Sequence, residues 1–264
     1  MSFTRRALLA GTAAAASTHV LSQRFGEWNM AEDGVLELRQ YTLYGGKRDT
    51  LISIFEKNLI EPQNELDAHV LGTFRDLDDP DRFVWLRGFR DMPARGKALE
   101  AFYGGPVWQA HKKDANATMV DSDNVLLLRP ASPGWGISEQ AARGTAGGVY
   151  AATIHYLGGV DAAQFAEFFD HAVLPLLTAA GVHPIARLVT EEQRNNFPRL
   201  PIREYDRAFL WLARWASLND YDAFLAHCRT WSGWRDAAPA SVLPALMQKP
   251  ERLRLIPTAR SQMQ

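Results

Sequence analysis

The chain of 264 residues has little cysteine, no surplus of charge of either sign and no long apolar run. Its single cysteine, Cys228, cannot form a disulfide within the chain and is too few for a cysteine-based zinc site. The 29 basic residues nearly balance the 30 acidic ones, so charge gives no reason to expect a nucleic-acid partner. No apolar run reaches the roughly 18 residues that a membrane-spanning helix requires. We therefore expect no nucleic-acid partner and no membrane span.

The motifs of the common cofactor-binding and hydrolase families are also absent from the sequence. It contains no G-x-G-x-x-G, G-x-x-x-x-G-K-[ST], G-x-S-x-G or H-E-x-x-H, and no two histidines stand at short metal-ligand spacing. The aspartates at positions 76, 78, 79 and 81 surround Pro80, which is more typical of a polar turn than of a cation loop. We therefore predict no metal site and no bound cofactor.

The first thirty residues have the layout of a targeting segment. Arg5 and Arg6 precede a mildly apolar stretch that ends in small residues, as in a secretory signal. Residues 4–9, TRRALL, are similar to the twin-arginine export pattern, which predicts a periplasmic or exported protein. The alternative is that Met30 is the true start and the protein is cytoplasmic. In both cases residues 1–30 are a signal or a disordered segment outside the fold.

Beyond this segment the chain contains an internal repeat of two units. The predicted domains are residues 31–130 and 149–264, joined by a linker at 131–148 that is rich in Gly, Ala and Ser. Both units open with a strand candidate, at 35–43 and 149–157, followed by a pair of glycines and an amphipathic helix. The stretch FVWLRGF at 83–89 then matches FLWLARW at 209–215. Pro62 and Pro175 lie near the end of each first helix and are expected to limit it.

The order of elements in each unit predicts an α+β fold. A second helix follows each matched strand, and last strands at 124–130 and 252–257 close the units, which gives β-α-β-β-α-β, the ferredoxin-like plan. Such a sheet carries its helices on one face, so its other apolar face needs a cover. We therefore expect the tandem ferredoxin-like repeats to pair their sheets into an α+β barrel.

Several stretches carry a family resemblance. They are ELRQYTL at 37–43, FRDLDDPDRFVWLRGF at 74–89, FYGGPVWQAH at 102–111, DSDNVLLL at 121–128 and, in the second unit, NNFPRLPIRE at 195–204 with FLWL at 209–212. In these residues the chain resembles the NIPSNAP family, a branch of the dimeric α+β barrel superfamily. The resemblance implies the barrel fold and a homo-oligomer. It implies no single reaction, because the superfamily includes cofactor-free monooxygenases, lactone isomerases and haem enzymes.

Polar residues on the first strand are the leading candidates for a site. Glu37, Arg39 and Tyr41 share one face of a strand that we expect to be covered on both sides. In the barrel lumen Arg39 could anchor an anionic or carbonyl group, Glu37 could orient it and Tyr41 could donate a hydrogen bond. The alternative is a structural Glu–Arg pair at the sheet edge or between the two halves.

The equivalent strand of the second unit places His155 where the first unit has Tyr41. Because imidazole titrates near neutrality, His155 is the candidate general base, although a histidine bound to a backbone carbonyl fits equally well. Trp85 and Arg87 on one strand, and Trp211 on its counterpart, could line an aromatic pocket or could simply belong to the core.

The two units differ most between Thr190 and Arg207, where the second unit inserts a long loop. Long loops within compact domains are often functional. This loop carries Phe197 and Arg203, which we assign to substrate binding as a lid over the second barrel mouth. A dimer-contact arm is the alternative.

These observations together predict a protein that binds or transforms a small carbonyl-containing or aromatic molecule in the barrel lumen. His155, Tyr41 and Arg39 are the expected catalytic residues, with Glu37, Trp85, Arg87, Trp211, Phe197 and Arg203 in substrate binding. Isomerase or cofactor-free oxygenase chemistry would suit such a site. The alternative is a non-catalytic binding or protein-interaction module.

Overall fold

Two successive sets of strands and helices form the fold in the computed structural model, which describes residues 34–137, 147–231 and 233–264. The export segment predicted at 1–30 and residues 138–146 of the predicted linker lie outside these ranges. The choice between an exported protein and a cytoplasmic one that starts at Met30 therefore stays a prediction.

The first unit follows the predicted order with two additional helices and one short strand. Its elements are β1 (Val35–Leu43), α1 (Arg48–Asn58), α2 (Ile60–Asn64), β2 (His69–Asp76), β3 (Arg82–Phe89), α3 (Met92–Gly104), α4 (Pro106–Asn116), β4 (Met119–Asp121) and β5 (Val125–Pro130).

The second unit has the same order of strands. Its elements are β6 (Val149–Tyr156), α6 (Ala162–Phe168), a π-helical turn (Phe169–Val173), α7 (Leu174–Ala179), β7 (Ala186–Thr190), β8 (Ala208–Trp215), α8 (Leu218–Cys228), α9 (Leu243–Leu246) and β9 (Glu251–Pro257).

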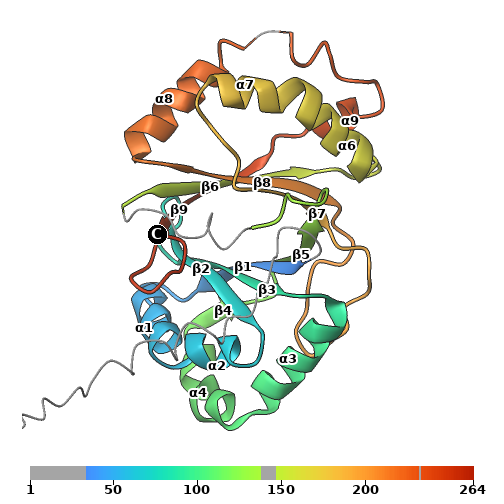
Figure 1. The fold of residues 1–264 in the computed structure, drawn as a ribbon. Coiled ribbons are helices and arrows are strands. Elements are labelled where there is room, and N and C mark those ends of the chain that lie inside the picture. The colour runs from blue at the N-terminus through green and yellow to red at the C-terminus, as the bar shows by residue number, and fades with distance from the viewer. Residues whose placement is uncertain (1–33, 138–146, 232) are drawn as a thin grey trace, which may run out of the picture.

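The strands close into one barrel that uses both units. Their order is β3-β2-β9-β6-β8-β7-β5-β1, and β1 also pairs with β3, which makes an eight-stranded antiparallel barrel with β4 added beside β1. The units meet along two seams, where β2 pairs with β9 and β5 pairs with β7. In Figure 1 the two sheets lie one above the other, with the helices of each unit on its outer side. The predicted α+β barrel is thus confirmed.

The lumen of this barrel is a filled hydrophobic core. Residues that alternate along the strands point inward from both sheets, among them Leu36 and Leu38 of β1 and Ala152 and Ile154 of β6, and they form one buried cluster. Met263, close to the C-terminus, belongs to the same cluster. The prediction of a polar site in the lumen is therefore wrong, because packing of the two sheets fills that space with aliphatic and aromatic side chains.

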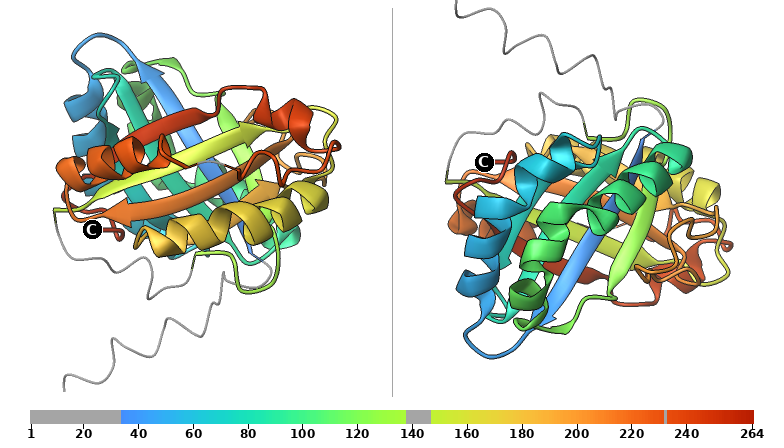
Figure 2. Two further views of the ribbon diagram at one scale, coloured as in Figure 1. Left: turned by 90° about the horizontal axis from the view of Figure 1, so that it is seen from above. Right: turned by 90° about the horizontal axis from the view of Figure 1, so that it is seen from below.

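Helices cover the outer face of each sheet, as the views from above and from below show (Figure 2). In unit one, Leu51 and Phe55 of α1 pack against Tyr41 and Trp85 of the sheet. In unit two, the helices bury a larger aromatic cluster that includes Phe165. Glu37, Arg39 and Tyr41, at odd-numbered positions of β1, therefore lie between sheet and helices.

Both prolines lie within helical segments rather than ending them. Pro62 lies inside α2, which directly follows α1, and Pro175 lies in the first turn of α7. A proline has no N–H for the regular helical bond, and the π-helical turn at Phe169–Val173 comes just before Pro175. The chain thus continues in the same helical path with a locally wider turn. Among the described residues, no helix is long and apolar enough to cross a membrane.

Candidate functional site

A fully buried carboxylate, Glu37, lies among three arginines beneath the helices of unit one. Its Oε2 accepts hydrogen bonds from Arg39 Nη1 at 2.9 Å and from Arg87 Nη2 at 2.5 Å. Its Oε1 accepts one from Arg95 Nε at 2.8 Å, and Arg95 Nη2 lies 2.7 Å away. All four side chains are 0% exposed. We call Glu37, Arg39, Arg87 and Arg95 the arginine cluster.

Strand pairing and a helix start bring the cluster together. In the antiparallel register of β1 and β3, Glu37 lies opposite Arg87 and Arg39 lies opposite Trp85. Arg95 comes from the first turn of α3, which begins where the Asp91 side chain accepts a hydrogen bond from Ala94 N at 2.7 Å. The site thus depends on β-sheet register and on one helix cap.

The charges of the cluster hold each other in the ionised form. Burial by itself raises the pKa of Glu37, but the charges of Arg87, Arg39 and Arg95 outweigh burial and hold this pKa far below its ordinary value. Burial likewise lowers the pKa of Arg39, but Tyr41 and Glu37 more than offset it, and the net shift is upward. Burial lowers the pKa of Arg95 against the opposing effect of Glu37. Glu37 is therefore a fixed anion and not a proton acceptor.

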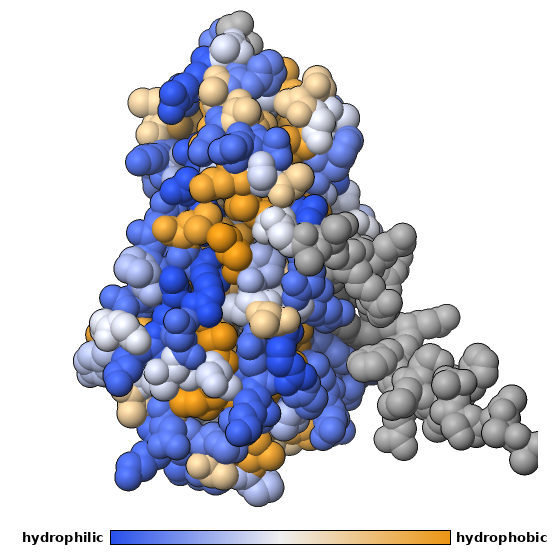
Figure 3. All heavy atoms as spheres, turned by 90° about the vertical axis from the view of Figure 1, so that its left-hand side faces the viewer, coloured by the Kyte–Doolittle hydropathy of each residue, from blue (hydrophilic) through white to orange (hydrophobic). Residues whose placement is uncertain are grey.

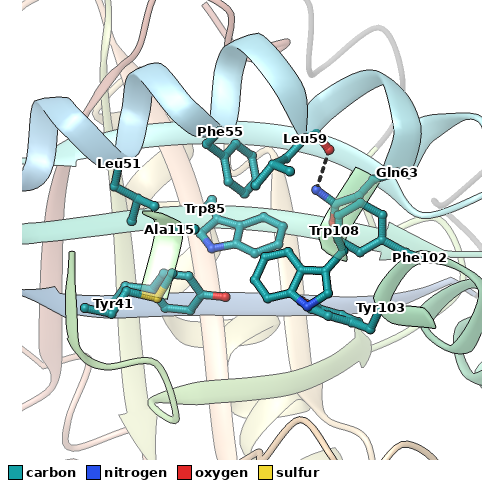
Figure 4. A pocket seen from close by; sticks show the side chains of 11 residues that line it. Tyr41, Leu51, Phe55, Leu59, Gln63, Trp85, Phe102, Tyr103, Trp108 and Ala115 are labelled. Atoms are coloured by element: carbon teal, nitrogen blue, oxygen red, sulfur yellow. Dashed lines mark hydrogen bonds between the residues drawn. The ribbon is translucent and has the colours of Figure 1, made fainter. Parts of the chain in front are cut away.

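A small cavity lies beside the cluster, between the sheet and the helices (Figure 4). Its volume is about 20 Å³, which is room for about one water molecule. Aromatic side chains dominate its lining, which consists of Tyr41, Leu51, Phe55, Leu59, Gln63, Trp85, Phe102, Tyr103, Trp108, Ala115 and Met119. The site is therefore an aromatic cavity with few polar atoms.

The Tyr41 hydroxyl is the polar group that joins the cavity to the cluster. It accepts a hydrogen bond from Arg39 Nε at 2.9 Å, and in Figure 4 it points towards Trp108. Burial raises the pKa of Tyr41, although Arg39 opposes this, so the phenol keeps its proton. No described residue accepts that proton in a hydrogen bond. The Trp85 indole N–H is also buried and without a partner among the described residues. Two hydrogen-bond donors that line the cavity are thus unused.

Gln63, on the cavity wall, holds Arg87 in place by a hydrogen bond. Its Oε1 accepts a hydrogen bond from Arg87 Nη1 at 2.7 Å, and its Nε2 donates to Leu59 O at 2.8 Å. The guanidinium of Arg87 also lies 4.9 Å from the Trp85 ring centroid. Apart from Glu37, the groups that contact Arg87 here are therefore an amide and an aromatic ring, and neither is a carboxylate.

The long loop between β7 and β8 reaches unit one instead of covering a mouth of unit two. Arg95 Nη1 donates to the side-chain oxygens of Asn195 at 3.0 Å and Asn196 at 2.7 Å, and Asn196 Nδ2 donates to Met92 O at 2.5 Å. Phe197 stacks on Tyr103 with 5.7 Å between ring centroids. In Figure 1 this orange segment runs down to α3. The predicted lid over the second mouth is therefore wrong in its location.

The second unit has no counterpart of the arginine cluster. Ala151 lies opposite Ala213 in the register of β6 and β8, at the positions that Glu37 and Arg87 occupy in unit one. His155 lies on the same face of β6, with its ring 5.2 Å from Phe165. Burial lowers its pKa to about 4, and the charge of Arg252 acts in the same direction. Its Nδ1 has no partner among the described residues.

The structure brings together only part of the predicted site. Arg39, Tyr41, Glu37, Trp85 and Arg87 meet in unit one, and Phe197 lies next to the cavity wall. His155 and Trp211 lie on the far side of the barrel, in the helix-covered core of unit two. Because two sheets separate them from Tyr41, a catalytic group of His155, Tyr41 and Arg39 does not assemble within one chain.

Arg203 occupies a third place, at one end of the barrel. Its Nη1 donates to Tyr156 Oη at 2.8 Å and to Asn124 Oδ1 at 3.1 Å, and its Nε donates to Asp206 Oδ2 at 2.5 Å. These partners hold the loop against the strands and do not line the cavity.

Sequence reasoning missed Arg95, Gln63, Asn195, Asn196, Tyr103 and Trp108. A signal existed for Arg95: Met92, Arg95, Leu99 and Phe102 are spaced as one buried helix stripe, and an arginine on such a stripe requires a buried partner. The asparagines carried no signal, because their role depends on a contact between residues about 100 positions apart.

The arrangement can hold an oxygen atom but has no free base. The cavity offers hydroxyl and N–H donors beside a cationic cluster, which suits a carbonyl oxygen or an oxyanion. In the described ranges, no three His, Cys, Asp or Glu side chains are grouped so that they could hold a metal ion.

Comparisons with known proteins agree with this architecture. A proposed monooxygenase from Fusobacterium nucleatum is 11% identical, with a TM-score of 0.53 over 86% of this chain and 93% of that one. An anthrone oxidase-like protein is 13% identical, with a TM-score of 0.51 over 87% and 93%. At these identities the likeness shows the fold alone. No curated protein matches the chain.

The family comparison concerns the unit that holds the arginine cluster. A NIPSNAP-like domain protein from Burkholderia xenovorans is 23% identical over 37% of this chain and 84% of its own, with a TM-score of 0.34. The family model described as NIPSNAP matches residues 36–133, which include Glu37, Arg39, Arg87 and Arg95. The first unit of the chain is therefore similar to the NIPSNAP family over these residues.

Proposed function

We propose that the cavity between the sheet and the helices of unit one binds a small aromatic or carbonyl-containing molecule. Tyr41 would donate a hydrogen bond to an oxygen of this molecule, and the aromatic lining would hold its ring. The proposal keeps the class of ligand that the sequence predicts but moves it from the lumen to the outer face of the sheet.

One observation carries the proposal: the Tyr41 hydroxyl accepts from Arg39 and keeps its own proton free at an aromatic cavity. A hydroxyl that accepts a hydrogen bond from a cation is a stronger donor, because the cation draws electron density from its oxygen. A buried donor without an acceptor costs free energy, so a ligand oxygen at this position would be favourable.

The chemistry that this site supports is stabilisation of negative charge on the bound oxygen. Glu37 is paired with three arginines, and the lining of the cavity contains no carboxylate and no histidine. Isomerisation by proton transfer would therefore require a proton acceptor on the substrate or from water. Oxygenation requires none if the substrate is bound as its carbanion: dioxygen oxidises the deprotonated CH group to a carbonyl by four electrons, one oxygen atom enters the product and the other leaves as hydroxide, which carries the remaining proton and the charge.

A ring enters the cavity only if part of the wall moves. The volume of about 20 Å³ is too small for a benzene ring, whereas Tyr103 and Trp108 are only partly buried. Trp108 lies on α4, of which only Ala115 is buried, and Gly105 alone separates this helix from α3. We expect α4 to move outward when a ligand binds, since few buried contacts hold it.

Fluorescence titration tests the proposal, because Trp85 and Trp108 line the cavity. We expect at least one of anthrone, benzaldehyde, phenol and benzoate to quench tryptophan emission saturably. Tyr41→Phe should weaken that binding about tenfold, the effect of one hydrogen bond to a buried oxygen. Tyr221→Phe, a buried tyrosine of unit two, is the matched control and should bind normally. Absence of saturable binding by all four compounds, or unchanged binding by Tyr41→Phe, would refute the proposal.

A non-catalytic binding module is the second candidate, favoured by the absence of a free base in the lining. Both candidates predict the same binding result. They differ in product formation: incubating the bound compound under oxygen should give a new product at a rate that falls in Tyr41→Phe if the protein is an enzyme, and none if it is a binding module.

A further inference from the structure

The arginine cluster contains a surplus of positive charge. Three guanidinium groups contact a single carboxylate, that of Glu37, which leaves two buried positive charges without a counter-charge. The other polar groups that contact the cluster are the amides of Gln63, Asn195 and Asn196 and the neutral Tyr41 hydroxyl. Amides and hydroxyls provide dipoles, whereas buried charges require charge of the opposite sign.

The aromatic rings around the cluster do not remove this surplus. The guanidinium of Arg39 lies 5.4 Å from the centroid of Tyr41 and 5.5 Å from that of Trp85. Ring faces attract cations, but they carry no net charge. The cluster therefore stays two charges short of neutrality with every described neighbour included.

The surplus lies directly beside the cavity. Arg39 contacts Tyr41 and Trp85, and both of these residues line it. Arg39 Nη2 is buried and has no hydrogen-bond partner among the described residues. An unpartnered guanidinium N–H, a phenolic O–H and an indole N–H thus occur within three neighbouring side chains.

We propose that the ligand of this cavity is an anion, a small planar molecule whose charge is delocalised over oxygen, such as a carboxylate or a phenolate. The negative oxygen would accept from Tyr41 Oη and Arg39 Nη2 and would supply part of the missing counter-charge. This inference rests on the proposed binding site and adds the charge of its occupant. In the described part of the second unit, alanines stand at the positions of Glu37 and Arg87.

Pairs of similar shape and different charge test the inference in the full-length protein. To test a carboxylate, the dissociation constant of benzoate is compared with that of neutral benzamide. To test a phenolate, 4-nitrophenol at a pH where it is ionised is compared with neutral 4-nitroanisole. We expect at least one anion to bind ten or more times more tightly than its neutral partner, and the pair that shows this identifies the oxyanion. If the neutral compounds bind as tightly as the anions, the anion inference is wrong and the binding site stands. If none of the four binds, the anion inference is wrong, and the titrations with anthrone, benzaldehyde and phenol decide whether the binding site stands.

Variants separate the charge from the shape of the cavity. Arg39→Gln removes one surplus charge and the unpartnered donor, and it should reduce the preference for the anion at least tenfold while circular dichroism stays unchanged. Arg187→Gln, a half-buried arginine of unit two paired with Asp170, is the matched control and should keep the preference. If Arg39→Gln does not fold, Tyr41→Phe replaces it and should reduce the preference for the anion, because a hydroxyl donates a stronger hydrogen bond to a charged oxygen than to a neutral one. An unchanged preference in the folded variant would overturn the inference.

Discussion

At the residue scale, the geometry of β1 places Glu37, Arg39 and Tyr41 on one buried face. Alternation places Leu36 and Leu38 in the lumen and Glu37, Arg39 and Tyr41 under the helices. The sequence predicted that these three residues share one face, and this is confirmed. Their alternative role, a structural Glu–Arg pair at the sheet edge or between the two halves, is met in the pair itself, since Glu37 accepts from Arg39 Nη1 at 2.9 Å, but this pair lies beneath the helices of unit one.

Glu37→Gln tests how strongly the cluster depends on its single carboxylate. The variant leaves three buried arginines without any counter-charge, and removal of one partner of a buried ion pair typically costs about 3–5 kcal/mol. We expect a loss of this size in the free energy of unfolding, measured with urea. Asp49→Asn is the control, since the ion pair of Asp49 with Arg75 is exposed, and it should cost less than about 1 kcal/mol. Equal effects of the two variants would contradict the central role of Glu37.

His155 makes the folded state sensitive to mild acid. Its pKa of about 4 lies below the ordinary value of 6.5, so between these values the unfolded chain binds a proton that the folded chain does not. Stability therefore falls as the pH drops from about 6.5 towards 4, by about 2 kcal/mol between pH 7 and 5. His155→Leu should lose less stability than the wild type over this range in urea titrations. The exposed His183→Leu should behave like the wild type, and an identical pH dependence of all three proteins would count against a buried neutral imidazole.

At the element scale, the loop between β7 and β8 belongs to the second unit but contacts the arginine cluster of the first unit. Asn196 lies so close to α3 that a Cβ on Gly96 would come within 2.8 Å of Asn196 Nδ2. The loop was predicted to be functional from its length alone. Its destination could not be predicted, because length says nothing about which surface a loop will contact.

Asn196→Ala tests this contact. It removes hydrogen bonds to Arg95 and to Met92 O, and leaves a buried guanidinium N–H with one partner fewer. We expect a loss of about 1–3 kcal/mol in the free energy of unfolding, together with weaker ligand binding in unit one. Arg199→Ala lies in the same loop but is exposed, and it should change stability by less than about 0.5 kcal/mol. A variant as stable as the wild type would show that the loop is not anchored at this point.

At the scale of the whole molecule, the barrel makes the two units one folding unit. Both seams, β2 with β9 and β5 with β7, join strands of different units, and the lumen core contains residues of both. Neither sheet can bury its apolar inner face without the other. The two domains predicted from the sequence, residues 31–130 and 149–264, therefore share one core.

Unfolding by urea should consequently follow a single transition. Tryptophan fluorescence reports on side chains in both units, and circular dichroism at 222 nm reports on all helices, so the two midpoints should coincide. Two separated transitions would mean that one unit stays folded without the other, which the shared core does not allow.

Closure of the barrel also changes the argument for an oligomer. The apolar sheet face that would require a second copy is covered by the second unit. On the face shown in Figure 3, the largest hydrophobic area lies at mid-height and hydrophilic residues surround it. A homo-oligomer stays a prediction, and it would have to form through the outer helices, loops or β4.

The sequence by itself determined the order of strands and helices, the barrel and the shared face of Glu37, Arg39 and Tyr41. The order of elements and the shared face follow from periodicity, which acts between near neighbours along the chain, and the barrel follows from the need to cover the apolar face of each sheet. Only the tertiary structure decided which face of the sheet meets the lumen, that Arg95 and Asn196 join the cluster, and that His155 lies apart from it. Each of these depends on contacts between segments far apart in sequence, and packing of two sheets around one core sets such contacts.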